Sequence, residues 1–78
     1  MLNIMNVQHE NMNVAQDVVD AFGGLTKTAK ALQHKSCSTI FYWIQAGHIP
    51  RWRYGEIENA ALNKGIQLPQ SFWKSKRQ

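Results

Sequence analysis

The fold of this chain is decided by one stretch, residues 26–43, which read TKTAKALQHKSCSTIFYW. The stretch predicts two short helices joined by a turn, the first over 26–33 and the second over 36–46. Thr26 and Ser36 are the predicted N-caps, because a hydroxyl oxygen can accept a hydrogen bond from a free backbone N–H. Four residues take the inward positions of the pair: Ala29, Leu32, Ile40 and Trp43. The outward positions are polar and include no acidic residue.

Further helices flank this pair. One is predicted over 14–22, with Asn13 as its cap and a Gly-Gly pair at its end. Another begins at Pro50 and runs to about residue 64. Its inward stripe is Trp52, Ile57, Ala60 and Ala61. We therefore predict an all-α fold, a compact helix-turn-helix domain of four to five helices, and the pattern allows short extended arms at the termini.

Composition divides the chain into three parts. Residues 1–13 are rich in Asn and Met and have no helical period, which predicts a flexible N-terminal arm. Residues 14–68 hold the predicted helix-turn-helix domain. Residues 69–78 form an aromatic and basic tail, in which Phe72 and Trp73 dock either on the body or on a second subunit.

Length and cysteine content point to a small intracellular domain. Seventy-eight residues suffice for one domain with a small core. Cys37 is the only cysteine, so the chain forms no internal disulfide, as is usual in a reducing cytoplasm. We find no apolar run that could span a membrane and no signal-peptide pattern. We expect a cytoplasmic protein of a bacterial cell or its phage, acting without a membrane.

Charge is unevenly distributed. The net charge is +4, yet residues 1–20 contain three acids and no Lys or Arg. Residues 21–55 contain no acid and five cations: Lys27, Lys30, Lys35, Arg51 and Arg53. A surface of one sign favours a polyanionic partner. A solvated basic face that serves only solubility remains the alternative. A helix pair with an acid-free outer face is typical of units that place one helix in the DNA major groove.

Candidate contacts follow from this arrangement. Ser and Gln can hydrogen-bond base edges, Phe can contact a thymine methyl group, and Tyr can bond a base or a phosphate. The predicted base-reading residues are Ser36, Cys37, Ser38, Phe41, Tyr42 and Gln45. The predicted phosphate-binding residues are Thr26, Lys27, Lys35, Arg51 and Arg53. Alternatively, Phe41 and Tyr42 pack against the N-terminal arm or a partner subunit.

The sequence lacks the residue patterns of a zinc site, a phosphate-binding loop or a catalytic centre. His34, Cys37 and His48 fall short of the four ligands of a closed zinc site. No glycine-rich phosphate loop follows a strand, and nothing orients Cys37 and His34 as a nucleophile and base. We expect no cofactor, no metal and no enzymatic activity.

The chain resembles the small Cro-type helix-turn-helix regulators, most closely the carph-isopro-type branch of phage and prophage genes. The resemblance covers residues 14–73. It rests on Phe22-Gly23-Gly24, Ala29-Lys30-Ala31-Leu32, Ser38-Thr39-Ile40, Trp43, Gly47-His48-Ile49-Pro50, Trp52-Arg53, Glu56-Ile57, Ala60-Ala61, Gly65-Ile66 and Leu68-Pro69. It implies a four- or five-helix DNA-binding domain that acts as a transcriptional repressor, usually as a dimer on an inverted repeat. The family commonly has glycine where this chain has Gln33. The interval from Leu32 to Ile40 is one residue longer than in the commonest helix-turn-helix pattern, a feature that the carph-isopro-type branch shares.

Two rival functions remain open at this stage. An antitoxin-like module would bind a protein partner through Phe41, Phe72 and Trp73 and repress its own operon. An architectural DNA binder would hold any sequence equally well.

Overall fold

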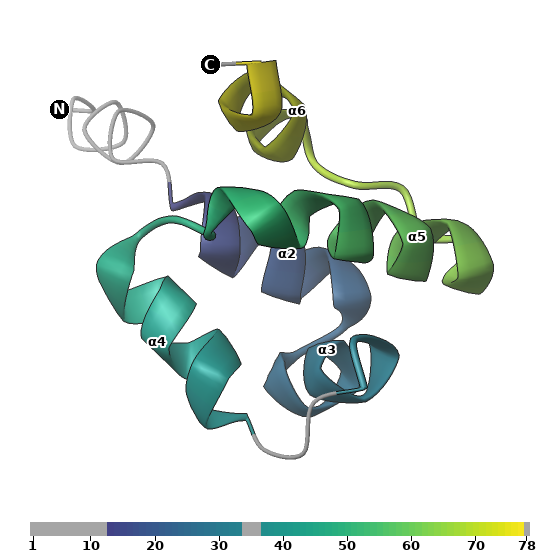
Figure 1. The fold of residues 1–78 in the computed structure, drawn as a ribbon. Helices are drawn as coiled ribbons and strands as arrows, with labels where there is room; N and C mark the ends of the chain where they lie inside the picture. Colours follow the sequence, from purple (N-terminus) through teal and green to yellow (C-terminus); the bar gives the residue numbers. More distant parts are fainter. Residues whose placement is uncertain (1–12, 34–36, 78) are drawn as a thin grey trace, which may run out of the picture.

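The computed structural model describes residues 13–33 and 37–77 (Figure 1). Within these residues there are five α-helices, one 3-10 helix and no strand. The α-helices are α2 (Val14–Phe22), α3 (Leu25–Ala31), α4 (Ser38–Ala46), α5 (Tyr54–Lys64) and α6 (Gln70–Arg77). The 3-10 helix, η1 (Arg51–Arg53), leads directly into α5. The predicted all-α class is confirmed. The predicted arm lies outside the described residues except for Asn13.

Helix α2 begins at the cap that the sequence predicts. The Oδ1 atom of Asn13 accepts a hydrogen bond from the backbone N–H of Gln16 at 3.0 Å. The Nδ2 atom of Asn13 donates to the carbonyl oxygen of Ile44 at 2.8 Å. One side chain therefore caps α2 and ties it to α4. The helix ends at Gly23, whose φ of 99° lies in the left-handed region where a Cβ atom would be disfavoured.

The core is built around α2, which packs against α3, α4 and α6. Val14, Val18 and Phe22 are spaced four residues apart and, with Ala15 and Val19, form its buried side. The other segments add Ala29, Leu32, Ile40, Trp43, Ile49, Tyr54, Ile57, Ala60, Ala61, Leu68 and Phe72. All four inward positions predicted for residues 26–43 are thus buried.

Helix α6 completes the core. The ring of Phe72 is fully buried and stacks on Tyr54, with ring centroids 4.8 Å apart. The hydroxyl of Ser71 donates to the Oδ2 atom of Asp17 at 2.7 Å, and the hydroxyl oxygens of Tyr54 and Ser75 are also 2.7 Å apart. Because truncating a buried phenylalanine typically costs about 3–5 kcal/mol, α6 contributes to the stability of the body. Of the two docking sites predicted for this aromatic anchor, Phe72 takes the one on its own chain.

The prediction that Trp52 belongs to the core is wrong. Its side chain is 79% exposed, whereas Tyr54 is buried. The prediction assumed one α-helix from Pro50 onward. Residues 51–53 instead form a 3-10 turn, with three rather than 3.6 residues per turn. The buried position therefore falls on Tyr54 and not on Trp52.

The predicted starts of α3 and α4 also need correction. Helix α3 begins at Leu25 with Gly24 as its N-cap, so Thr26 lies exposed in the first turn and is not the cap. The Thr28 hydroxyl donates to the carbonyl oxygen of Gly24 at 2.7 Å. Helix α4 begins at Ser38, after Cys37 in the N-cap position. The start predicted at Ser36 lies outside the described residues.

Two glycines allow a matched test of the backbone. Gly24 has φ 125° and ψ 171°, a conformation that is essentially restricted to glycine. Gly55 lies in α5 with open space around an added Cβ atom. We expect Gly24→Ala to lower the free energy of unfolding by about 1–3 kcal/mol. Gly55→Ala should raise it by about 0.5–1 kcal/mol, because alanine has the higher helix propensity. Urea denaturation of both variants measures whether the free energy of unfolding falls or rises in each. A loss of similar size in both would contradict the turn geometry.

Gln33 offers a second backbone test. Its φ of 61° lies in the left-handed region, which costs a residue with a Cβ atom about 1–2 kcal/mol. Gln33→Gly should therefore raise the free energy of unfolding by about 0.5–1 kcal/mol, after allowing for the greater freedom of glycine in the unfolded chain. Gln33→Ala is the control, since alanine keeps the strain. Equal denaturation midpoints for the two variants would rule out strain at this position.

Candidate nucleic-acid interface

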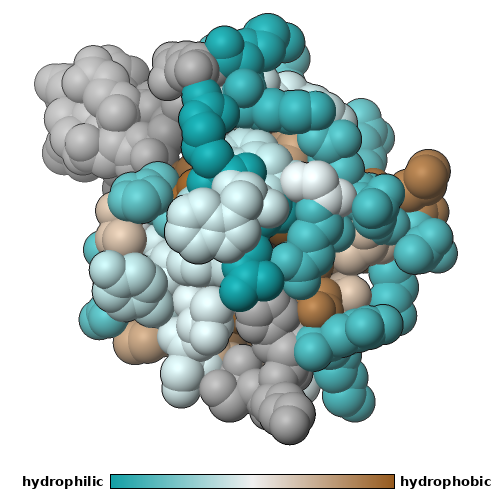
Figure 2. All heavy atoms as spheres, in the orientation of Figure 1, coloured by the Kyte–Doolittle hydropathy of each residue, from teal (hydrophilic) through white to brown (hydrophobic). Residues whose placement is uncertain are grey.

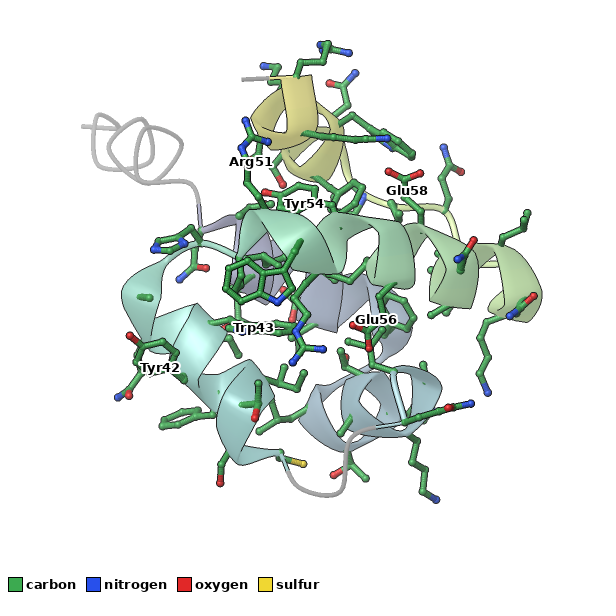
Figure 3. The ribbon with its side chains drawn as sticks, in the orientation of Figure 1. Tyr42, Trp43, Arg51, Tyr54, Glu56 and Glu58 are labelled. Carbon is green, nitrogen blue, oxygen red and sulfur yellow. The ribbon has the colours of Figure 1, made fainter. Side chains whose placement is uncertain are left out.

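The outer face of α4 carries a continuous exposed stripe. Ser38, Phe41, Tyr42 and Gln45 are three and four residues apart, so they share one side of the helix. Phe41 is 49% exposed and Tyr42 is 66% exposed. The opposite side of α4 holds the buried residues Ile40 and Trp43. Figure 3 shows Tyr42 pointing away from the body and Trp43 pointing toward α5. The exposure predicted for these four side chains is confirmed.

The stripe offers several kinds of contact to base edges. A serine hydroxyl, a glutamine amide and a tyrosine hydroxyl can each donate and accept hydrogen bonds. The aromatic faces of Phe41 and Tyr42 can pack on thymine methyl groups. A B-DNA major groove about 12 Å wide admits a single α-helix. The stripe on α4 therefore has the shape and chemistry for direct readout of DNA.

Negative charge is absent from the sequence around this stripe. No acidic residue occurs between residues 21 and 55. The next acid, Glu56, accepts from the Nη1 atom of Arg53 at 2.9 Å in a half-exposed ion pair. The guanidinium of Arg53 also lies 5.9 Å from the centre of the Trp43 ring. The positive charge of Arg53 therefore offsets the negative charge of Glu56, which is the carboxylate nearest to α4 in the sequence. Figure 2 shows that the side of the molecule seen in Figure 1 is mostly hydrophilic, with scattered hydrophobic residues.

The predicted phosphate-binding residues occupy separate places. Thr26 and Lys27 are exposed in the first turn of α3. Arg51 is exposed in η1, and its Nη1 atom donates to the carbonyl oxygen of Lys76 at 3.4 Å. Arg53 is half-buried by its contacts with Glu56 and Trp43. The structure therefore brings Arg51 and Arg53 together in one segment but groups Lys27 elsewhere, with the other lysines described below.

Three further predicted contact residues remain. Lys35 and Ser36 lie outside the described residues. Cys37 is partly buried against the core at the N-cap of α4, so its contribution to the outer face is smaller than expected.

One exposed aromatic residue was missed by the sequence reasoning. Trp52 lies between Arg51 and Arg53 in η1, with most of its ring in solvent. Its indole N–H can donate to a phosphate, and its ring can stack on a base. The signal was present in the sequence, because an aromatic residue between two arginines is a pattern that nucleic-acid-binding surfaces use.

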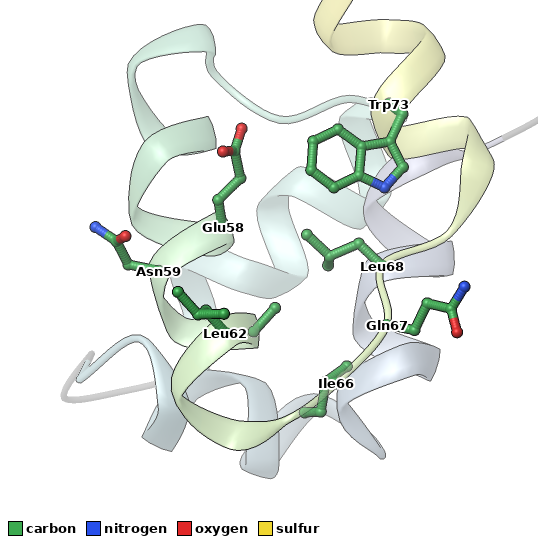
Figure 4. Close-up of a pocket in the computed structure, with 8 residues that line it drawn as sticks. Glu58, Asn59, Leu62, Ile66, Gln67, Leu68 and Trp73 are labelled. Atoms are coloured by element: carbon green, nitrogen blue, oxygen red, sulfur yellow. The ribbon is translucent and has the colours of Figure 1, made fainter.

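A second surface feature is an apolar groove beside α5 (Figure 4). It has a volume of about 360 Å³ and is lined by Glu58, Asn59, Ala61, Leu62, Ile66, Gln67, Leu68 and Trp73. Leu62 is 78% exposed and Trp73 is 38% exposed. Lys76 pairs with Glu58 and lies 5.6 Å from the centre of the Trp73 ring, which holds this indole at the edge of the groove. The groove gives the chain an exposed apolar surface besides α4.

Residues 13–33 and 37–77 contain neither a cluster of metal-ligand side chains nor a membrane-spanning helix. Within these ranges no three His, Cys, Asp or Glu side chains are grouped so that they could hold a metal ion. None of the helices found there is both long and apolar enough to cross a membrane.

Comparisons with protein-family models, curated proteins and solved structures found no match for this chain. Its function is therefore inferred from its own residues and their placement.

Proposed function

We propose that this chain is a sequence-specific double-stranded DNA-binding repressor of Cro type that inserts α4 into the major groove. The observation that carries the proposal is the exposed stripe of Ser38, Phe41, Tyr42 and Gln45 on a helix whose other side is buried. The 35 residues around it, 21–55, contain no acid that would repel phosphate. The resemblance to small phage and prophage regulators agrees with this function.

Each part of the interface has a separate task. Tyr42 and Gln45 read base edges in the groove, and Ser38 contacts a base near the start of α4. Thr26 and Lys27 contact the backbone from the start of α3, and Arg51 and Trp52 contact it from η1. Since phosphate contacts carry no sequence information, specificity comes from the α4 stripe while affinity depends on the cations.

Repression follows from occupying a promoter. In the cell the protein acts in the cytoplasm, on DNA, and a bound copy blocks the polymerase sterically. Two copies on an inverted repeat bind half-sites about one helical turn apart. Leu62 and Trp73, at the groove in Figure 4, are the candidate contacts for the second copy.

The exposed groove also favours a second candidate function. An antitoxin-like module would use it to hold a protein partner while α4 binds its own operator. Phe72, expected to join that contact, is buried and does not belong to it. Leu62 takes its place beside Trp73. A partner that co-purifies in stoichiometric amounts, and is lost on Leu62→Ala, would select this function over a simple repressor.

Selection of bound duplexes from a random pool tests the proposed function. We expect the wild-type chain to enrich an inverted repeat. The variants Tyr42→Ala and Gln45→Ala should enrich a changed or shortened motif, because each removes a base contact worth about 1–3 kcal/mol of discrimination. Asn63→Ala, an exposed substitution on α5 outside the groove of Figure 4, is the control and should keep the wild-type motif. An unchanged motif in both stripe variants would show that α4 is not the reading helix. Recovery of random sequence by the wild type would select the architectural binder instead.

The phosphate contacts are tested by salt dependence. Arg51→Gln should weaken binding to all duplexes alike and reduce the slope of log K against log salt concentration by about 1. Lys74→Gln removes the same charge from an exposed position on α6 and should leave the slope nearly unchanged. Fluorescence anisotropy at several salt concentrations measures both. Equal slopes for the two variants would mean that only net charge matters and that η1 makes no phosphate contact.

A further inference from the structure

Three lysines from two helices surround a second hollow, which we call the lysine hollow. It has a volume of about 320 Å³ and is lined by Phe22, Lys27, Lys30, Ala31, Lys64 and Ile66. Lys27 and Lys30 come from α3, and Lys64 is the last residue of α5. The sequence could not group them, since Lys64 is more than thirty positions from the other two.

The charge of the lysine hollow has no counter-charge among the residues that the structure describes. None of the described residues that line it carries a carboxylate. Across residues 13–33 and 37–77, Lys27, Lys30 and Lys64 form no ion pair. Three lysines that line one hollow bring like charges near one another, and an anion bound among them would reduce their repulsion. Lysine is a common phosphate ligand because its ammonium acts as a point charge with three donors.

The remaining lining residues narrow the class of ligand. Phe22, Ala31 and Ile66 are apolar, so the hollow can hold an uncharged ring beside its charged rim. Its volume lies at the lower end of the range of about 300–1,000 Å³ that is typical of small-molecule sites. A DNA duplex is too wide to enter a hollow of this size. The fit is therefore to a small molecule that carries both a phosphate and a ring.

We propose that the lysine hollow binds a small phosphate ester with an uncharged aromatic ring, of the class of nucleoside monophosphates. This site lies apart from the α4 stripe, and it shares only Lys27 with the proposed DNA contacts. Lys64 ends α5 at one side of the molecule, and Tyr42 points outward from the opposite side (Figure 3). The ligand would bind without touching the α4 stripe, and its binding does not depend on the proposed DNA function.

Titration of the free protein with adenosine 5′-monophosphate, followed by amide chemical shifts, tests the proposal. We expect saturable shifts at residues around the lysine hollow. Lys30→Gln and Lys64→Gln should each weaken binding by about fivefold or more, because each removes one charge-assisted contact. Lys74→Gln removes an exposed charge on α6 and is the matched control, with an expected change below about twofold. Equal weakening by all three would mean that net charge alone attracts the anion, and would overturn the site.

Inorganic phosphate and adenosine test separately the phosphate and the ring-bearing part of the proposed ligand. Inorganic phosphate and adenosine should each bind at least about tenfold more weakly than the monophosphate, since each reaches only part of the lining. Inorganic phosphate binding as tightly as the monophosphate would overturn the role of the apolar floor. Absence of saturable shifts at millimolar monophosphate would overturn the proposal altogether. All three lysines are exposed, so the variants should fold, which thermal denaturation checks.

Discussion

The burial of Ile40 and Trp43 against the body is the constraint on which the rest of the molecule depends. An α-helix turns 100° per residue, so fixing two inward side chains fixes the rotation of α4 about its axis. Their neighbours Phe41 and Tyr42 must then face solvent whatever their apolar character. Asn13 strengthens this arrangement, because it binds the carbonyl oxygen of Ile44 near the end of α4. The exposed aromatic pair is therefore a geometric consequence of the core.

A chain of this size has a small hydrophobic core, and α6 supplies an important part of it. Without Phe72, the ring of Tyr54 would lose its stacking partner. Polar contacts support the same joint, since Ser71 binds Asp17 and Ser75 binds Tyr54. The last helix therefore ties α2 and α5 together, although the two are separated in sequence by the whole of α3 and α4.

The sequence pattern correctly predicted those helix ends and helix sides that depend on residues close together in the chain. Asn13 as a cap, the stripe on α2 and the outward face of α4 depend on spacings of three and four residues. The same reasoning misplaced Trp52, because a 3-10 turn changes which residues of the following helix face inward. The residue types at 51–53 do not reveal this turn. It left the docking of Phe72 open, since the surface that buries this ring comes from distant parts of the chain. The lysine hollow was beyond prediction for the same reason. The inward positions of the α3–α4 pair were predicted correctly, whereas the N-cap assigned to Thr26 was not.

The misplaced tryptophan has a spectroscopic consequence. The three indoles of this chain occupy three environments: Trp43 is buried, Trp52 is almost fully in solvent, and Trp73 is partly covered at the apolar groove. Emission from a buried indole is shifted to shorter wavelength than emission from a solvated one. The chain thus contains its own optical probes, with Trp43 sensitive to loss of the core, Trp73 to occupation of the groove, and Trp52 to whatever approaches η1.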